Sequence, residues 1–70
     1  MDIKERINRD FTYHPPKSGQ PERFQAIRET ARYFALHITE NTPASREQSL
    51  ALTALEEAVF WANAAIARNE

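Results

Sequence analysis

Three side chains in the first half of the chain could recognise a ligand that carries flat rings and negative charge: Tyr13, Arg28 and Thr30. The phenol ring of Tyr13 can stack on a base, and its hydroxyl can meet a phosphate. The guanidinium of Arg28 can hold a phosphate in a fork, with the hydroxyl of Thr30 donating beside it. For Arg28 the alternative to phosphate binding is a position in solvent, where most arginines on helices lie. For Tyr13 the sequence leaves stacking on a ligand and packing on the protein equally open.

A second candidate anion site lies at the predicted start of the last helix. Ser45 and Arg46 would stand beside backbone N–H groups that favour anions. The alternative is a helix cap followed by a surface arginine, and the residue types alone favour that alternative. Asn63 is unfavourable inside a helix, so we expect its amide to bond across a subunit contact or to a ligand.

Catalytic and metal-binding patterns are missing from the sequence. The histidines, His14 and His37, are far apart and no cysteine accompanies them, so we expect no metal site. Glu56 and Glu57 are neighbours, and neighbours on a helix point about 100° apart, so they do not form an acid–base pair. We therefore expect no cofactor, and no residue pattern supports an enzyme, although the members of a catalytic triad meet in space and need no fixed spacing in the sequence.

Composition limits the class of protein further. A chain of 70 residues makes one domain, residues 1–70, close to the lower limit of independent stability. The formal net charge of −1 argues against a DNA or RNA partner, and a single glycine excludes a phosphate-cradling glycine-rich loop. No apolar run approaches the ~20 residues of a membrane span, and the first residues lack an apolar signal core. We expect no membrane partner.

The periodicity predicts an all-α fold, a short N-terminal helix followed by an antiparallel helical hairpin. The first helix is expected over about Asp2 to Arg9, capped by Asp2. A turn with two prolines follows, in which Phe11 is expected to pack against the hairpin. The second helix should start near Ser18 to Pro21 with Ser18 as its cap, and the third should run from Ser45 to Asn69 with a capping box. The apolar stripe of the second helix comprises Phe24, Ile27, Ala31, Phe34 and Ile38.

The last helix has two apolar stripes. The first comprises Leu52, Leu55, Val59, Ala62 and Ile66, and the second, on an adjoining face, comprises Ala51, Ala54, Ala58, Trp61 and Ala65. One stripe can pack on the second helix, and little of the chain remains to cover the other. An apolar face without an internal partner usually marks an interface. We therefore predict a homo-oligomer.

Two segments of the chain resemble a known family. They are the string from Phe11 to Pro16 and the last helix from Ser45 to Asn69. Both resemble the bacteriophage anti-CBASS cyclic-oligonucleotide sponges, which share a helical hairpin with an anti-Thoeris sponge family. The resemblance implies a compact hexamer that holds cyclic dinucleotides such as 3′,3′-cGAMP between subunits, without cleaving them, in the cytoplasm of the infected bacterial host. It also implies that some members hold cyclic trinucleotides at a second site.

The resemblance assigns roles to individual residues. Tyr13 would stack on a base, while Arg28 and Thr30 fit the basic residue and the threonine two positions later on the hairpin helix. Arg68, and more weakly Arg46, would serve the trinucleotide site. Two alternatives stay open: a small helical interaction module that binds a host protein, and a cyclic-nucleotide hydrolase with a triad formed between chains.

Overall fold

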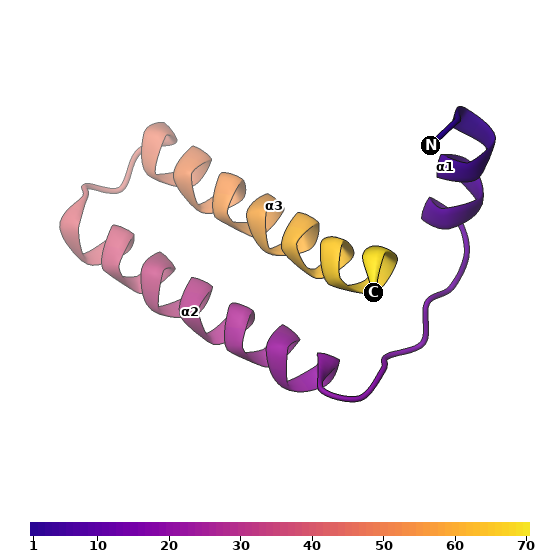
Figure 1. Ribbon diagram of the computed structural model, residues 1–70. Coiled ribbons are helices and arrows are strands. Elements are labelled where there is room, and N and C mark those ends of the chain that lie inside the picture. Colours follow the sequence, from indigo (N-terminus) through magenta and orange to yellow (C-terminus); the bar gives the residue numbers. More distant parts are fainter.

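The computed structural model describes residues 1–70 as three α-helices without a strand (Figure 1). The helices are α1 (Ile3–Asp10), α2 (Gln20–Asn41) and α3 (Arg46–Asn69). α2 and α3 lie side by side and antiparallel, joined by the short loop 42–45. α1 stands apart, beyond the carboxyl end of α3, and is connected to α2 by residues 11–19, which we call the strap. The predicted all-helical hairpin is thus confirmed.

The ends of α1 and α3 follow the sequence signals. The Asp2 carboxylate accepts a 2.8 Å hydrogen bond from the Glu5 backbone N–H, and the Ser45 hydroxyl accepts one of 3.1 Å from the Gln48 backbone N–H. Each bond satisfies one of the unpaired donors of a helix start. Only half of the expected capping box forms, because the Gln48 side chain donates to the carbonyl and hydroxyl oxygens of Thr42.

The start of α2 differs from the expectation. The residue before the helix is Gly19, with φ of 83°, and no side chain caps the helix. The predicted cap at Ser18 is therefore wrong. A left-handed backbone at this position is strained for any residue with a Cβ atom, which explains why the only glycine of the chain stands here. Pro21 occupies the first turn, where its missing N–H costs nothing.

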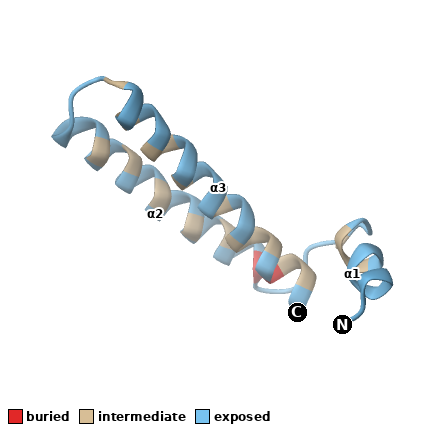
Figure 2. Cartoon of the chain, turned by 90° about the horizontal axis from the view of Figure 1, so that it is seen from above, coloured by how far each residue is buried: buried red, intermediate tan, exposed pale blue.

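The two hairpin helices meet along one narrow seam (Figure 2). The first stripe of α3 supplies its half of the seam, from Leu52 to Ile66, and each of its five members is half-buried or buried. From α2 come half-buried Phe24, Ile27, Ala31 and Ile38. Phe34 was expected among them but is largely exposed, and Ala35 takes its place. Small residues at the centre of the seam let the helices approach, so the large Phe34 ring stays at the flank.

The single chain has almost no core. Only Ile66, at 8% exposure, and Gln20, at 3%, are buried. The second stripe of α3 is mostly exposed, and Trp61 keeps 66% of its surface in solvent. The radius of gyration is 15.3 Å, against about 11 Å for a compact domain of this length. The molecule is a slab of 44 × 28 × 15 Å with apolar side chains on its outside.

The N-terminal part adds to this exposed apolar surface. Phe11 was expected to pack against the hairpin but is mostly exposed, as is Ile3 on α1, and Ile7 keeps 47% of its surface in solvent. The expectation was wrong because the strap carries α1 away from the hairpin flanks (Figure 1). These three apolar side chains of α1 and the strap therefore enlarge the exposed apolar surface.

α3 meets the length and composition of a membrane-crossing helix, with a mean hydropathy of 1.3 over its most apolar 18-residue window. This differs from the expectation that no run approaches a membrane span. Two features weigh against a bilayer as the surroundings of this helix. One stripe already packs on α2, and Glu56 and Glu57 lie near the middle of the helix, where a carboxylate costs about 2.5–3.5 kcal/mol in a bilayer.

Candidate functional site

The strap presents Tyr13 to solvent, with 79% of its surface exposed. Its two neighbours fix the backbone on either side. The Thr12 hydroxyl donates to the Asn8 carbonyl oxygen, and the ring Nε2 of His14 bonds to the Arg9 carbonyl oxygen at 2.7 Å. Tyr13 is thus an exposed aromatic ring on a constrained segment, which is the arrangement that stacking on a base requires.

Arg28 lies on one flank of the hairpin, at the edge of a groove of about 410 Å³ between α2 and α3. Arg32, Glu56 and Phe60 line the same groove, and its floor is apolar. Gln25 holds the guanidinium of Arg28 by accepting a 3.0 Å hydrogen bond from Nη1. The sequence analysis did not identify Phe60 as a candidate site residue. Its only signal in the sequence was a second large aromatic side chain directly before Trp61.

Thr30 lies on the other flank. It lines a second, apolar groove together with Phe34 and Ala58, and its hydroxyl donates to the Ala26 carbonyl oxygen at 2.9 Å. Residues two apart on a helix point about 200° from each other. Arg28 and Thr30 of one chain therefore do not face one ligand, and the grooves of two adjoining copies would have to meet for the pair to act together.

Arg46 and Arg68 mark opposite ends of α3, about 33 Å apart at 1.5 Å per residue. At the first end the Ser45 hydroxyl already accepts from Gln48, and Arg46 is exposed. At the second end Arg68 is half-buried and stands within a cluster of charges. The structure separates these two candidates completely.

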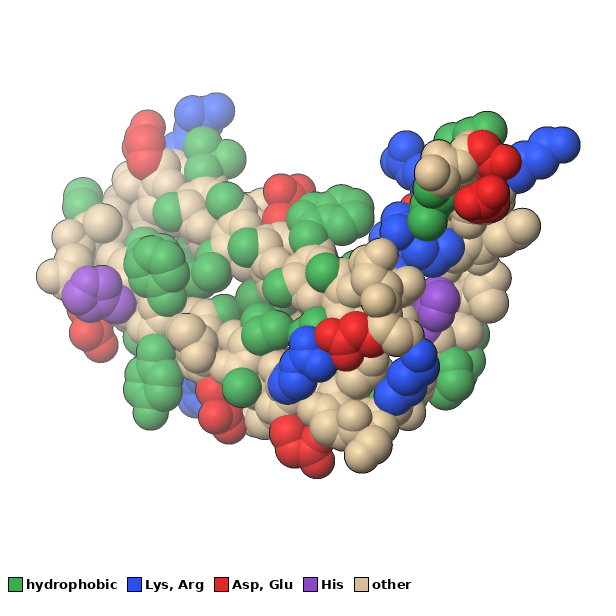
Figure 3. All heavy atoms as spheres, viewed as in Figure 1, with side chains coloured by type: hydrophobic (Ala, Val, Ile, Leu, Met, Phe, Trp, Pro, Cys, Tyr) green, Lys and Arg blue, Asp and Glu red, His purple; other side chains and the backbone are tan.

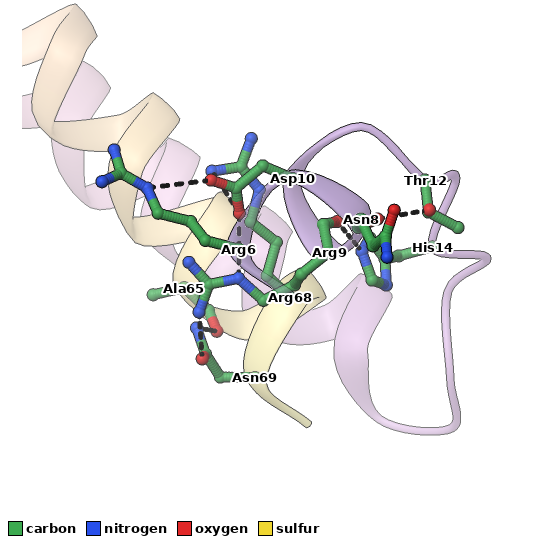
Figure 4. Close-up of polar contacts among 9 residues, drawn as sticks. All are labelled: Arg6, Asn8, Arg9, Asp10, Thr12, His14, Ala65, Arg68 and Asn69. Carbon is green, nitrogen blue, oxygen red and sulfur yellow. Dashed lines mark hydrogen bonds and ion pairs between the residues drawn. The ribbon is translucent and has the colours of Figure 1, made fainter. Parts of the chain in front are cut away.

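The charges around Arg68 come from α1 (Figure 4). The Asp10 carboxylate lies 2.9 Å from Nε of Arg9 and 3.7 Å from both Nε of Arg6 and Nη1 of Arg68. Arg9 also donates to the Asn69 side chain at 3.1 Å. The hydrogen bond from Arg9, with the nearby charges of Arg9, Arg68 and Arg6, holds the pKa of Asp10 below its usual range against a smaller opposing effect of desolvation. We call these four side chains (Arg6, Arg9, Asp10, Arg68) the arginine cluster.

The arginine cluster borders a cleft between α1 and α3. One wall is the exposed ring of Trp61 with Ala64 and Ala65. Three guanidinium groups around one carboxylate leave an excess of positive charge beside an aromatic ring. Sequence reasoning found Arg68 but missed Arg6 and Arg9. Their spacing of three on α1 was a signal, yet nothing in the sequence placed α1 beside the end of α3.

A second charged group closes the open end of the hairpin. Arg23 binds the Glu70 carboxylate with two hydrogen bonds of 2.8 and 2.7 Å, and Gln20 donates to it at 3.3 Å. Figure 3 shows acidic and basic side chains together at this end. These bonds, first that from Arg23, lower the pKa of Glu70, and the pairing raises that of Arg23.

The arrangement is suited to binding anions with flat rings. Exposed aromatic rings lie on the strap, and an aromatic ring lies together with guanidinium groups at the Arg28 groove and at the α1–α3 cleft. No group of three or more His, Cys, Asp or Glu side chains is placed to hold a metal ion. The five predicted residues do not converge within one chain, and their roles stay predictions.

Comparison with known protein families gives a match over almost the whole chain. The family model described as Acb2/Tad1, hairpin domain, matches residues 3–67. Neither the curated proteins nor the solved structures gave a match. The matched range includes α1, the strap, α2 and all of α3 except its last two residues.

Proposed function

Because the chain belongs to the Acb2/Tad1 hairpin-domain family, the family of anti-CBASS and anti-Thoeris sponges, we propose that it sequesters cyclic dinucleotides such as 3′,3′-cGAMP. The family match over residues 3–67 carries this proposal, and it supports a sponge-type role in phage anti-defence. Sequestration without cleavage would deprive CBASS effectors of their activating signal in the cytoplasm of the infected bacterial host. Membership of a sponge family implies sequestration rather than catalysis.

We further propose that the working form is a homo-oligomer, with the hexamer that the resemblance implies as its first candidate. The lone chain buries only Ile66 and Gln20 and leaves the second stripe of α3 exposed. In addition, Oδ1 of Asn63 is buried without a hydrogen-bond partner. An unsatisfied buried acceptor costs about 1–3 kcal/mol, which a donor from an adjoining copy would offset. Both observations support assembly.

The ligand would bind where copies adjoin. Tyr13 supplies a ring for stacking, Arg28 a guanidinium for a phosphate, and Thr30 a hydroxyl on the opposite flank of the hairpin. A cyclic dinucleotide carries two bases and two phosphates, so symmetry-related copies of such a set would match it. Cyclic trinucleotides are proposed for a separate site at Arg68, where Arg6 and Arg9 add positive charge. Arg46 is the weaker candidate for that site.

Heat release tests the proposal. The protein is incubated with 3′,3′-cGAMP and filtered to remove free ligand, and the retained fraction is then heated and analysed by chromatography. A sponge retains the ligand and releases it intact. Linear products would show that the protein is a hydrolase. A ligand that passes the filter would refute sequestration and favour an interaction module that binds a host protein through the exposed apolar face.

A further inference from the structure

The strap that carries Tyr13 is tied to the rest of the chain at both ends. On its N-terminal side Thr12 and His14 bond to carbonyl oxygens of Asn8 and Arg9, at the end of α1. α1 itself is held to the end of α3 by the arginine cluster and by the bond from Arg9 to Asn69. Between Tyr13 and α2 lie two prolines, which make no backbone N–H bonds. On its C-terminal side the strap is joined to α2 by a 3.0 Å backbone hydrogen bond from the Gln20 N–H to the Lys17 carbonyl oxygen and by a side-chain anchor.

Gln20 forms that anchor. It is the only buried polar residue, at 3% exposure, and its side chain joins three segments. Oε1 accepts a 3.0 Å hydrogen bond from the Lys17 backbone N–H in the strap. Nε2 donates to the Ile66 carbonyl oxygen of α3 at 3.4 Å and to the Glu70 carboxylate at 3.3 Å. No other side chain links the strap, the start of α2 and the last turn of α3.

Neighbouring charges keep the anchor in place. Arg23 of α2 grips the Glu70 carboxylate with both terminal nitrogens, and the Lys17 ammonium donates to the Glu70 backbone oxygen. The Glu70 carboxylate that accepts from Gln20 is thus held by Arg23, and the Glu70 backbone is held by Lys17. A buried amide that uses its oxygen and its nitrogen in this way is expensive to remove, because its partners would lose hydrogen bonds where water enters poorly.

We propose that Gln20 is a positioning residue for ligand binding, which sets the place of the Tyr13 ring relative to the Arg28 groove by fixing the strap to the end of α3. Gln20 itself does not touch the ligand, since its side chain is buried and both its amide oxygen and its amide nitrogen are already hydrogen-bonded within the chain. The inference rests on the proposed function and deepens it. It explains why a glutamine is buried in a chain that buries almost nothing else.

Two variants separate positioning from plain stability. Gln20→Ala removes the anchor, and Gln48→Ala removes a side chain that likewise bridges a loop, at the opposite end of the hairpin. Both should lower the melting temperature. We expect only Gln20→Ala to weaken 3′,3′-cGAMP binding in calorimetry, by about tenfold, which corresponds to about 1.4 kcal/mol. Equal affinity losses in the two variants would refute the positioning role.

A double-mutant cycle tests whether Gln20 acts through Tyr13. On a Tyr13→Ala background, Gln20→Ala should cost little additional affinity, since the ring that it positions is gone. Additive losses would overturn the proposal. If Gln20→Ala does not fold, Gln20→Glu serves instead, because it keeps the oxygen that accepts from Lys17 and loses the donors to Ile66 and Glu70.

A measurement without ligand distinguishes failure of the anchor from failure of the proposed function. The two tyrosines are replaced by 3-fluorotyrosine, and Tyr33→Phe assigns the ¹⁹F signals. Gln20→Ala should shift or narrow the Tyr13 signal, and Gln48→Ala should leave it unchanged. An unaltered Tyr13 signal in Gln20→Ala refutes the anchoring. If the wild type binds no cyclic dinucleotide, the proposed function falls, and the binding role of Gln20 falls with it whatever the signal shows.

Discussion

Replacing Trp61 by glutamate should break the assembly that the exposed second stripe of α3 predicts. The ring keeps 66% of its surface exposed in the single chain. If a subunit contact covers this share of the roughly 250 Å² that a tryptophan can bury, about 165 Å² leaves water. At about 25 cal/mol per Å² this contributes about 4 kcal/mol per subunit. The loss corresponds to nearly a thousandfold weaker association, before the cost of burying the new carboxylate is added.

The assay is light scattering coupled to size exclusion over a range of protein concentrations. Trp61 also borders the α1–α3 cleft, so Ala58→Glu, on the same stripe but away from that cleft, is the second test. Ser49→Glu places the same charge on α3 outside the second stripe and serves as the control. We expect both test variants to shift to lower mass and the control to keep the wild-type mass. Wild-type mass in both test variants at all concentrations would show that the stripe is not an interface.

Three further results are expected. Tyr13→Ala should lower cyclic dinucleotide affinity at least about tenfold in calorimetry, because base stacking on an aromatic ring is worth about 1–3 kcal/mol, while light scattering should show an unchanged mass. Acidification should weaken the contact between α1 and α3: the pKa of Asp10 is lowered in the folded chain, chiefly by the hydrogen bond from Arg9 and to a smaller extent by the charge of Arg68 on α3, so the stabilising contribution of Asp10 is present above the usual carboxyl range and is lost as the pH falls through the lowered pKa. The fluorescence emission of the single tryptophan, Trp61, which borders the α1–α3 cleft, should report the weakened contact. Asp10→Asn should remove this pH dependence of the emission. Ser45→Ala should lower the melting temperature by roughly 4–8 °C, as a lost cap costs about 1 kcal/mol, and an unchanged melting temperature would mean that this cap is dispensable.

Local structure was predictable from the sequence because its causes are local. Asp2 and Ser45 cap α1 and α3 as expected, since a capping side chain bonds to a backbone N–H three residues away. The two prolines of the strap interrupt the helical pattern through their own geometry. The first stripe of α3 also packs as expected, because its spacing fixes one face. Ser18 failed as a cap, since a glycine next to it allowed a left-handed turn instead.

Among the candidate site residues, the sequence indicated which side chains have the right chemistry but not where they meet. Arg28 and Thr30 are close along the chain, yet the structure places them on opposite flanks of the hairpin. Arg68 joins Arg6 and Arg9, which are about sixty residues away in sequence. The helical period could have revealed that Arg28 and Thr30 lie on opposite flanks. No local signal could have revealed that Arg68 lies beside Arg6 and Arg9, because the path of the strap places α1 at the end of α3.

What the sequence determined by itself is the set of helices, their capped ends, the seam between α2 and α3 and the surplus apolar stripe, all of which follow from side-chain types at short, regular spacing. What only the tertiary structure decided is the placement of α1 at the end of α3, the exposure of Phe11 and Phe34, and the burial of Gln20. The physical reason is that these depend on contacts between segments far apart in the chain. Such contacts are selected by the geometry of the whole fold and leave no period in the sequence.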